Sequence, residues 1–150
     1  MEVRAADGNE CRRYHMELTK MLYELLNADS DGDMYSLEHC EKKSAELQQY
    51  LDDNQAVFIG AFDDGIVGFI WAFIQTKNKQ RRLHLNYLFV KEEYRRQKVA
   101  TLLMSHLEEY ARENKVQGVE LFVNASNQNA IEFYLKHNFK KERMQLYKQI

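Results

Sequence analysis

Apolar residues in the first third of the chain recur three and four positions apart in two segments. One stripe runs through residues 14–25 and the other through residues 37–51, and each is typical of an amphipathic helix. Ser36 stands directly before the second stripe, where a short polar side chain can cap a helix. The sequence NADSDGD at residues 27–33 separates the stripes and consists of turn-forming residues. We therefore predict two helices joined by a polar loop.

The middle of the chain has the pattern of strands. Residues 57–62 and 66–74 are apolar runs on either side of the sequence DDG at residues 63–65, which predicts a β-hairpin. A polar connection at residues 75–82 leads to an aromatic and β-branched run at residues 83–90. We expect this run to form a third strand next to the hairpin.

The other elements alternate between strand and helix. They are a short strand at residues 3–5, a helix that begins near Val99, a strand at residues 119–123, a helix capped by Ser126 or Asn127 that ends at a left-handed Asn138, and an edge strand at residues 145–149. The order strand, helix, helix, three strands, helix, strand, helix, strand predicts an α/β fold. Its sheet is mixed, antiparallel in the N-terminal half, and covered by helices on both faces.

Composition limits the class of protein. The chain has 150 residues and a formal net charge of −2, which suits a single domain over residues 1–150. Eight Phe, nine Tyr and one Trp supply enough apolar mass for a core, so disorder is not expected. The isoelectric point of about 6.2 lies far below that of a typical nucleic-acid-binding domain. We therefore expect no DNA or RNA partner.

The cysteines and the apolar runs indicate in which cellular compartment we expect the protein. Cys11 and Cys40 have neither CxxC spacing nor enough companions for a disulfide framework or a zinc site, and we interpret both as buried thiols. No metal site is expected. The first 13 residues are polar and charged, unlike a secretory signal, and the longest apolar run, at residues 66–74, is too short to span a membrane. A cytoplasmic protein with no membrane partner is the expectation.

The most informative segment joins the strand at residues 83–90 to the helix after it. First-turn amides of a helix have no intrahelical partner, and the helix dipole favours negative charge there. Arg95, Arg96 and Lys98 add positive charge at this point, and Thr101 adds a hydroxyl. Spacing alone leaves two interpretations open, an anion-binding site and an ordinary solvated basic loop.

Two motifs extend this observation. Arg95, Lys98 and Ala100 occupy the fixed places of the pattern Arg/Gln-x-x-Gly-x-Gly/Ala. A later pattern, Asn…Asn-x-x-Ala…Tyr-x-x-x-x-Phe, matches Asn127, Ala130, Tyr134 and Phe139. In these motifs, and from about Ala56 to the C-terminus, the sequence resembles the GNAT N-acetyltransferase family. The resemblance implies a GNAT-like acyl-CoA N-acyltransferase fold, with a mixed central sheet splayed at its middle.

The resemblance also implies acetyl-CoA as cofactor. Its pantetheine arm would pair with unpaired backbone groups at Leu88, Phe89 and Val90, where an N–H near Phe89 or Val90 would polarise the thioester carbonyl. Asn127, in the second motif with Ala130, would either bind the cofactor arm or cap its helix. The pyrophosphate would rest on the amides of Arg96, Gln97, Lys98, Val99, Ala100 and Thr101.

The catalytic roles are carried over in the same way. Tyr134 is the candidate acid that protonates the departing thiolate, and the alternative is an ordinary aromatic of a buried stripe. The family often has Glu as base on the fourth strand, where this chain has Asn86. By two-residue alternation His84 shares a face with Asn86, so His84 is one candidate base. Glu120 on the next strand is another, and a water relay without a single base is a third.

Two further features leave alternatives open. Lys98 stands where the family usually has Gly, so its side chain points away, contacts a phosphate, or weakens cofactor binding. Asp29, Asp31 and Asp33 lie where the family shapes its acceptor pocket, and they either attract a cationic amine or form a solvated turn. Asn86 completes the predicted acceptor site, and Tyr35, Trp71 and Phe73 either line this pocket or fill the core.

The sequence thus predicts an N-acetyltransferase that transfers acetyl from acetyl-CoA to a primary amine by direct attack. The enzyme alternatives are a protein N-terminal or lysine acetyltransferase and an aminoglycoside-type acetyltransferase. A non-catalytic acyl-CoA-binding or sensing module is the rival from a different class. The exposed edge of the C-terminal strand also allows a homodimer.

Overall fold

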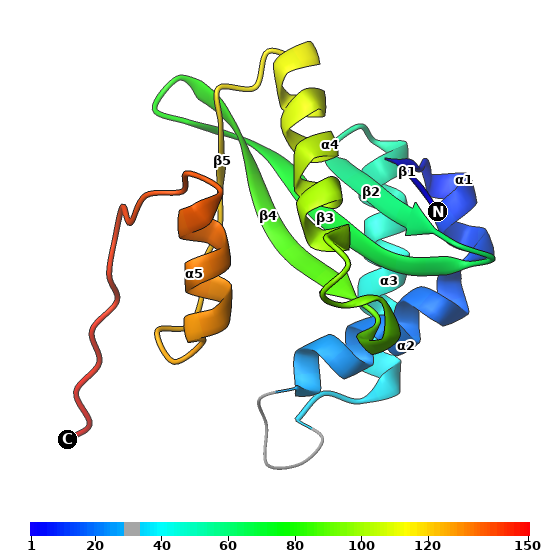
Figure 1. Cartoon of the computed structure of the whole chain (residues 1–150), viewed down its shortest axis with the longest axis horizontal. Helices are drawn as coiled ribbons and strands as arrows, with labels where there is room; N and C mark the ends of the chain where they lie inside the picture. The colour runs from blue at the N-terminus through cyan, green and yellow to red at the C-terminus, as the bar shows by residue number, and fades with distance from the viewer. Residues whose placement is uncertain (29–33) are drawn as a thin grey trace.

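The computed structural model describes residues 1–28 and 34–150 as one five-stranded sheet with helices on both faces (Figure 1). The strand order is β1-β2-β3-β4-β5; the first four strands are antiparallel neighbours, and β4 and β5 are parallel. The mixed sheet with an antiparallel N-terminal half confirms the predicted fold class. The strands are β1 Glu2–Ala5, β2 Ala56–Phe62, β3 Ile66–Lys77, β4 Gln80–Val90 and β5 Gly118–Glu120.

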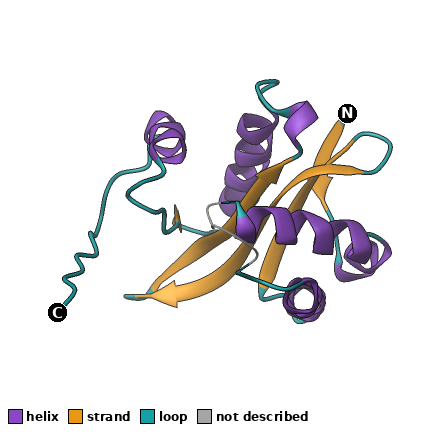
Figure 2. Cartoon of the chain, turned by 90° about the horizontal axis from the view of Figure 1, so that it is seen from below, coloured by secondary structure: helices purple, strands orange, loops and turns teal. Residues whose placement is uncertain are grey.

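Helices cover the two faces of the sheet unequally, as Figure 2 shows. The helices are α1 Gly8–Arg13, α2 His15–Asn27, α3 Leu37–Asp52, α4 Val99–Glu113 and α5 Gln128–Lys136, with a 3-10 turn η1 at Glu92–Tyr94. The first three pack on one face and α4 on the other, with α5 beside α4. Ser36 and Asn127 cap α3 and α5, and Asn138 has a φ of 67°, so these three predictions are confirmed. Within the described ranges, no helix is long and apolar enough to cross a bilayer.

Two cores hold these layers together. Leu103, Met104 and Leu107 of α4 are buried on one face of the sheet. The other core joins α1, α2 and α3 to the opposite face and contains both cysteines, as predicted. Burial raises the pKa of Cys11 to about 12, so its thiol is unreactive at neutral pH. Because α4 is fixed by three fully buried side chains, its N-terminus is held rigidly against the end of β4.

A β-bulge interrupts β4 near its middle. Trp71 of β3 lies opposite Tyr87, whereas the next β3 residue, Ala72, lies opposite Leu85. Asn86 is therefore an extra residue with no partner on β3. A bulge of this kind bends the strand and increases its local twist.

The bulge changes the phase of the side-chain alternation. Leu83 before it and Leu88 and Val90 after it all belong to the core beside α4. A two-residue count that crosses Asn86 therefore fails. The count from His84 to Asn86 ends before the change of phase, so the expectation that these two residues share a face stays a prediction. His84 follows the local alternation and faces away from α4.

Three predicted connections differ from the structure. The polar segment at residues 75–82 is not a loop, because it forms the ends of β3 and β4. Asn78 and Lys79, with φ of 52° and 62°, make the two-residue turn between them. Alpha1 was not predicted, since its six residues are too few for a periodic pattern. The predicted strand at residues 119–123 is paired only as far as Glu120 in the described chain.

The predicted C-terminal strand at residues 145–149 is wrong for the single chain. Residues 139–150 form neither helix nor strand with any described part of the protein. A strand needs a neighbour that completes its hydrogen bonds, and this segment runs away from the sheet (Figure 1).

Candidate active site

The parallel strands β4 and β5 pair over three residues and then separate. The pairs run from Arg82 and Gly118 to His84 and Glu120, and no further ladder joins the two strands in the described chain. The rest of β4 therefore has a strand neighbour on the β3 side alone. The structure thus contains the splayed edge that the resemblance implied.

Hydrogen-bond alternation shows which groups face the open edge. The N–H of Lys91 donates to the Val67 carbonyl across β3, at 2.9 Å. In an antiparallel pair every second residue bonds the same neighbour, so Phe89 pairs with β3, and Leu88 and Val90 point their N–H groups toward β5. Of the two N–H groups expected at this edge, that of Phe89 is therefore directed to β3, and that of Val90 faces the open edge.

The loop after β4 ends in a left-handed residue. Arg96 and Lys98 have φ of 63° and 62°, and α4 begins at the next residue, Val99. Lys98 is the N-cap, and no side chain in the described structure caps this helix. The amides of residues 99–101 thus have no intrahelical partner and no competing cap. The position where the family has Gly does adopt the conformation that Gly tolerates best.

Arg95 has a role that the motif did not indicate. Its Nε donates to the Val90 carbonyl at 2.8 Å, and its guanidinium lies 3.7 Å from the Glu24 carboxylate of α2 and 5.7 Å from the ring centre of Phe89. These contacts fasten the loop to the end of β4 and to α2. This predicted cofactor-binding residue therefore also holds the loop in place, and its contact with a cofactor stays a prediction.

The other cationic side chains of this loop are exposed. Arg96 and Lys98 make no hydrogen bond or ion pair with any residue that the structure describes. Gln97 instead donates to the Glu93 carbonyl at 3.0 Å and holds the loop to η1. Arg96 and Lys98 are thus available to an anion at the start of α4.

The Lys98→Gly variant distinguishes the attraction between the Lys98 charge and an anionic ligand from the strain of the left-handed backbone at this residue. Glycine removes the strain of the left-handed residue but loses more entropy on folding, so the net change in stability is within about 1 kcal/mol. Loss of one exposed charge is expected to weaken coenzyme A binding about threefold, measured by calorimetry. Lys115→Gly is the matched control, because Lys115 is left-handed (φ 56°) at the opposite end of α4. Tighter binding by Lys98→Gly would contradict this role of the ammonium group.

Asn127 and Ala130 form the cap of α5. The Asn127 side-chain oxygen accepts from the Ala130 N–H at 3.2 Å. Of the two roles predicted for Asn127, capping is therefore observed. The same bond satisfies the amide of Ala130, which removes it from the donors open to a cofactor.

Tyr134 packs beside α4. Its ring lies 5.4 Å from those of Phe133 and Phe139 and contacts the core on that face. Burial raises the pKa of Tyr134 to about 12, so the phenol keeps its proton throughout the neutral range. Its hydroxyl has no hydrogen-bond partner in the described part of the chain, so it can donate to a ligand.

His84 and Glu120 form the last pair before the strands separate. His84 Nδ1 lies 3.3 Å from Glu120 Oε2, and the two side chains are 14% and 17% exposed. Burial opposes ionisation of Glu120, but the hydrogen bond with His84 and the charges of Lys77 and Arg82 outweigh it. The pKa of Glu120 therefore lies below its ordinary value, and the carboxylate stays charged.

The two candidate proton carriers occupy opposite faces of the sheet. His84 lies between Leu83 and Leu85, which both face α4, so its side chain points to the face of α1, α2 and α3. Tyr134 packs on the α4 face. A proton acceptor at His84 and a proton donor at Tyr134 can thus act independently on the two sides of the open edge.

The predicted acceptor residues are only partly brought together. Asp29, Asp31 and Asp33 lie outside the described residues. Tyr35 is fastened to α2, because its N–H donates to the Asn27 side chain at 2.9 Å. Asn86 is exposed at the bulge.

Two aromatic residues were missed. Phe122 is 84% exposed and lies 5.1 Å from the His84 ring, and Tyr87 contacts the Trp71 ring at 5.2 Å. The alternation at residues 119–123 places Phe122 on the same face as Glu120, so the sequence contained this signal. The sequence did not indicate which face Tyr87 occupies, because residues 87–90 are uniformly apolar and show no alternation. Trp71 is 1% exposed and belongs to the core.

An open strand edge thus leads to uncapped amides at a helix N-terminus, an arrangement that suits a ligand with an extended arm and an anionic end. The family model described as Acetyltransferase (GNAT) family matches residues 19–139, and the chain belongs to this family. The chain is 29% identical over 103 residues to the probable N-acetyltransferase san of Drosophila melanogaster, a match that covers 67% of this chain and 56% of that protein. It is 34% identical over 98 residues to an N-alpha-acetyltransferase of Saccharolobus solfataricus, covering 59% of each protein. The chain thus spans little more than half the length of these curated relatives.

Solved structures share the whole fold. A possible acetyltransferase from Clostridium difficile 630 superposes with a TM-score of 0.80 at 19% identity, covering 99% of this chain and 96% of that one. The aminoglycoside N-acetyltransferase AAC(6')-Iy, in a complex with CoA, gives 0.78 at 15% identity, covering 99% and 93%. At these identities the likeness establishes the fold.

Proposed function

We propose that this protein is an acetyl-CoA-dependent N-acetyltransferase that acts on a primary amine by direct attack. One observation carries the proposal. N–H groups without a partner among the described residues run from Leu88 and Val90 on the open edge of β4 to residues 99–101 at the start of α4. A ligand with an extended amide-bearing arm and a diphosphate fits this row of donors.

The donors along the row have different roles. The amides of residues 99–101, with the exposed charges of Arg96 and Lys98, bind the diphosphate. Val90 and Leu88 hold the arm by strand-like hydrogen bonds. Because the diphosphate end lies at α4, Leu88 is the donor closer to the far end, where its N–H polarises the thioester carbonyl. When bound, acetyl-CoA supplies the activated acetyl group, and fixed geometry gives the amine an entropic advantage.

Proton transfer is divided between the two faces. His84, oriented by Glu120, accepts a proton from the incoming amine on the α1–α3 face. Tyr134 donates its hydroxyl proton to the departing sulfur on the α4 face. Exposed Phe122 next to His84 offers an apolar surface to the acceptor.

Names of the curated relatives favour an acceptor class. The Saccharolobus relative is named an N-alpha-acetyltransferase, and an Arabidopsis thaliana relative, 36% identical over 72 residues (47% of this chain, 41% of that protein), is the catalytic subunit of an N-terminal acetyltransferase B complex. The relatives in the structural comparison include aminoglycoside acetyltransferases at lower identity. We therefore place a peptide α-amino group first and an aminoglycoside second.

Release of free thiol from acetyl-CoA tests the proposal. The panel contains a peptide with a free N-terminus, the same peptide with a blocked N-terminus, a polyamine and an aminoglycoside. We expect turnover with the free peptide and none with its blocked counterpart. Coenzyme A binding without thiol release for any amine would identify a non-catalytic acyl-CoA-sensing module instead.

His84→Gln tests the base. We expect kcat to fall about 10²-fold, because the variant has no imidazole to accept the proton. A matched control is His106→Gln, on α4, because no hydrogen bond, ion pair or ring contact among the described residues joins His106 to His84 or Glu120. An unchanged kcat would favour a water relay.

Glu120→Gln tests the pair through stability. Because the pKa of Glu120 is lowered in the folded protein, its charged form stabilises the fold above its ordinary pKa of 4.5, and this contribution is lost as pH falls through the lowered value. The difference in unfolding free energy between wild type and variant should therefore shrink from pH 6 to pH 3. Denaturant titrations at several pH values measure it, and a pH-independent difference would contradict the ionised pair.

A further inference from the structure

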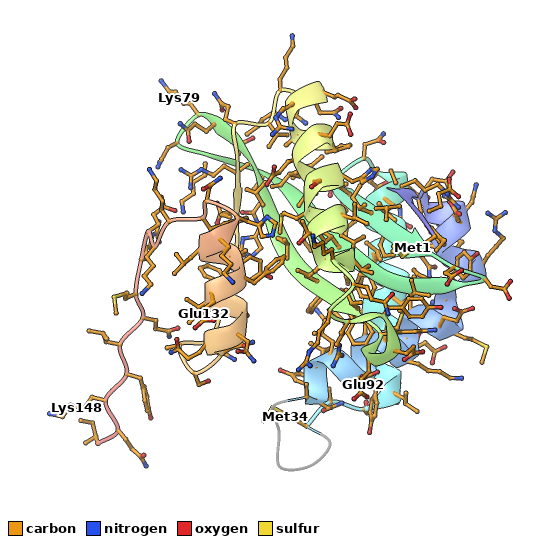
Figure 3. The ribbon with its side chains drawn as sticks, viewed as in Figure 1. Met1, Met34, Lys79, Glu92, Glu132 and Lys148 are labelled. Atoms are coloured by element: carbon orange, nitrogen blue, oxygen red, sulfur yellow. The ribbon has the colours of Figure 1, made fainter. Side chains whose placement is uncertain are left out.

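The C-terminal segment, residues 139–150, presents apolar side chains to water. Figure 3 shows it extending away from the sheet, with the labelled Lys148 near its end. Met144, Leu146, Tyr147 and Ile150 are 79%, 87%, 85% and 108% exposed. Such a concentration of exposed apolar residues in one short segment marks an interaction surface.

A second apolar surface lies at the edge of the sheet. Beta5 is the last strand and has a neighbour on one side only, so its outer N–H and C=O groups are unpaired in the described chain. Phe122, Val123 and Leu135 are exposed just beyond it. Glu120 Oε1 is buried there without a hydrogen-bond partner among the described residues, although the Arg82 guanidinium lies 3.6 Å from it. This edge can therefore accept one more strand.

The segment begins beside this edge and then leaves it. Residues 140–142 line a hollow of about 320 Å³ together with β5, and Glu142 lies 3.4 Å from Arg82 of β4. From Arg143 onward the segment runs into solvent (Figure 1). The β5 edge and residues 143–150 therefore belong to neighbouring parts of one molecule but form no strand pair within the described chain.

We propose that residues 143–150 of one copy pair as a strand with the β5 edge of a second copy. Residues 143–150 of the second copy pair in the same way with the β5 edge of the first. Both surfaces belong to the same chain, so a two-fold exchange covers both at once, whereas a different partner would cover one. Each segment is ~26 Å long when extended. Two such strands with the apolar residues of two edges can supply an interface of ordinary size, about 800 Å² per partner.

Charge is compatible with the second copy as occupant. Residues 143–150 contain Arg143 and Lys148 and no acidic residue, whereas the receiving edge contains Glu120, which also lies near Arg82 and His84, and the exposed Glu132 of α5. The exchanged strand also reaches the site, because Phe122 on the receiving edge lies beside His84. The exchanged strand of each copy then borders the acceptor side of the other.

Sedimentation of the full chain gives the first test. We expect a dimer at micromolar concentration that Leu146→Asp converts to a monomer. Gln145→Asp is the matched control, because it adds the same charge on the opposite face of the extended segment and should leave the dimer intact. A wild-type monomer at 100 µM, or a dimer that Leu146→Asp leaves unchanged, would overturn the exchange.

Cross-linking gives a second test that does not depend on the folding of Leu146→Asp. One population has Phe122→Cys, and the other has Leu146→Cys or Tyr147→Cys. The two native thiols are buried and provide the wild-type background. After mixing and mild oxidation, we expect a disulfide between the two populations. An intramolecular disulfide in a monomeric double variant would instead show that the segment folds onto its own edge. A monomer with full thiol-release activity would overturn this inference and leave the proposed function intact.

Discussion

Tyr134→Phe is expected to lower kcat about 10²-fold or more and to change acetyl-CoA affinity less than threefold. The substitution removes one hydroxyl and keeps the ring that packs against Phe133 and Phe139. The hydroxyl has no hydrogen-bond partner in the described protein, so the fold loses little when it is removed. The loss thus falls on the step in which the departing sulfur gains a proton.

The pH dependence follows from the raised pKa of Tyr134. A neutral phenol is favoured in the folded protein, so its contribution to stability is complete below pH 10 and is lost as pH rises toward about 12. Tyr134 therefore adds no titration to the rate profile between pH 6 and pH 9. Tyr110→Phe, on the same α4 core, is the matched control and should leave kcat unchanged. An unaltered kcat in Tyr134→Phe would remove this residue from the acid role.

Ala100→Asp is expected to weaken coenzyme A binding about 10²-fold without destabilising the protein. A carboxylate in the first turn of α4 interacts favourably with the helix dipole, by about 0.3–1 kcal/mol. The same charge repels a diphosphate on the amides of residues 99–101. Binding and stability should therefore move in opposite directions.

Ala100→Asn separates charge from bulk, because it has the same size as Asp without the negative charge. Calorimetry with coenzyme A at low and high salt, together with thermal unfolding, gives both readouts. Salt should restore part of the affinity of the Asp variant and little of that of the Asn variant, since screening acts on charge. Wild-type affinity in Ala100→Asp would show that the diphosphate binds elsewhere.

Much of the fold was predictable because local chemistry and packing agree. The stripes at residues 14–25 and 37–51 and the caps Ser36 and Asn127 depend on nearest neighbours along the chain. The bulge was not predictable, since Asn86 looks like an ordinary polar position and the apolar run at residues 87–90 hides the change of phase.

The site was predictable as a segment but not as a set of contacts. The left-handed Lys98 follows from the motif, whereas the contact of Arg95 with Val90 depends on the direction of one side chain in a folded loop. The strand expected at residues 145–149 needs a neighbour that a sequence cannot display. The same limit applies to residues 121–123, which have strand-like composition but no ladder.

Asn86 is an extra residue of β4 that the strand pairing with β3 does not need. Leu85 and Tyr87 already alternate as if Asn86 were absent, so deleting Asn86 would leave every other side chain on its present face. Because a bulge bends its strand, we expect the shortened strand to be straighter and β5 to pair with it beyond Glu120. We expect the shortened protein to be more stable and to bind coenzyme A less tightly. The N–H groups of Leu88 and Val90 would then form hydrogen bonds within the sheet instead of facing a ligand.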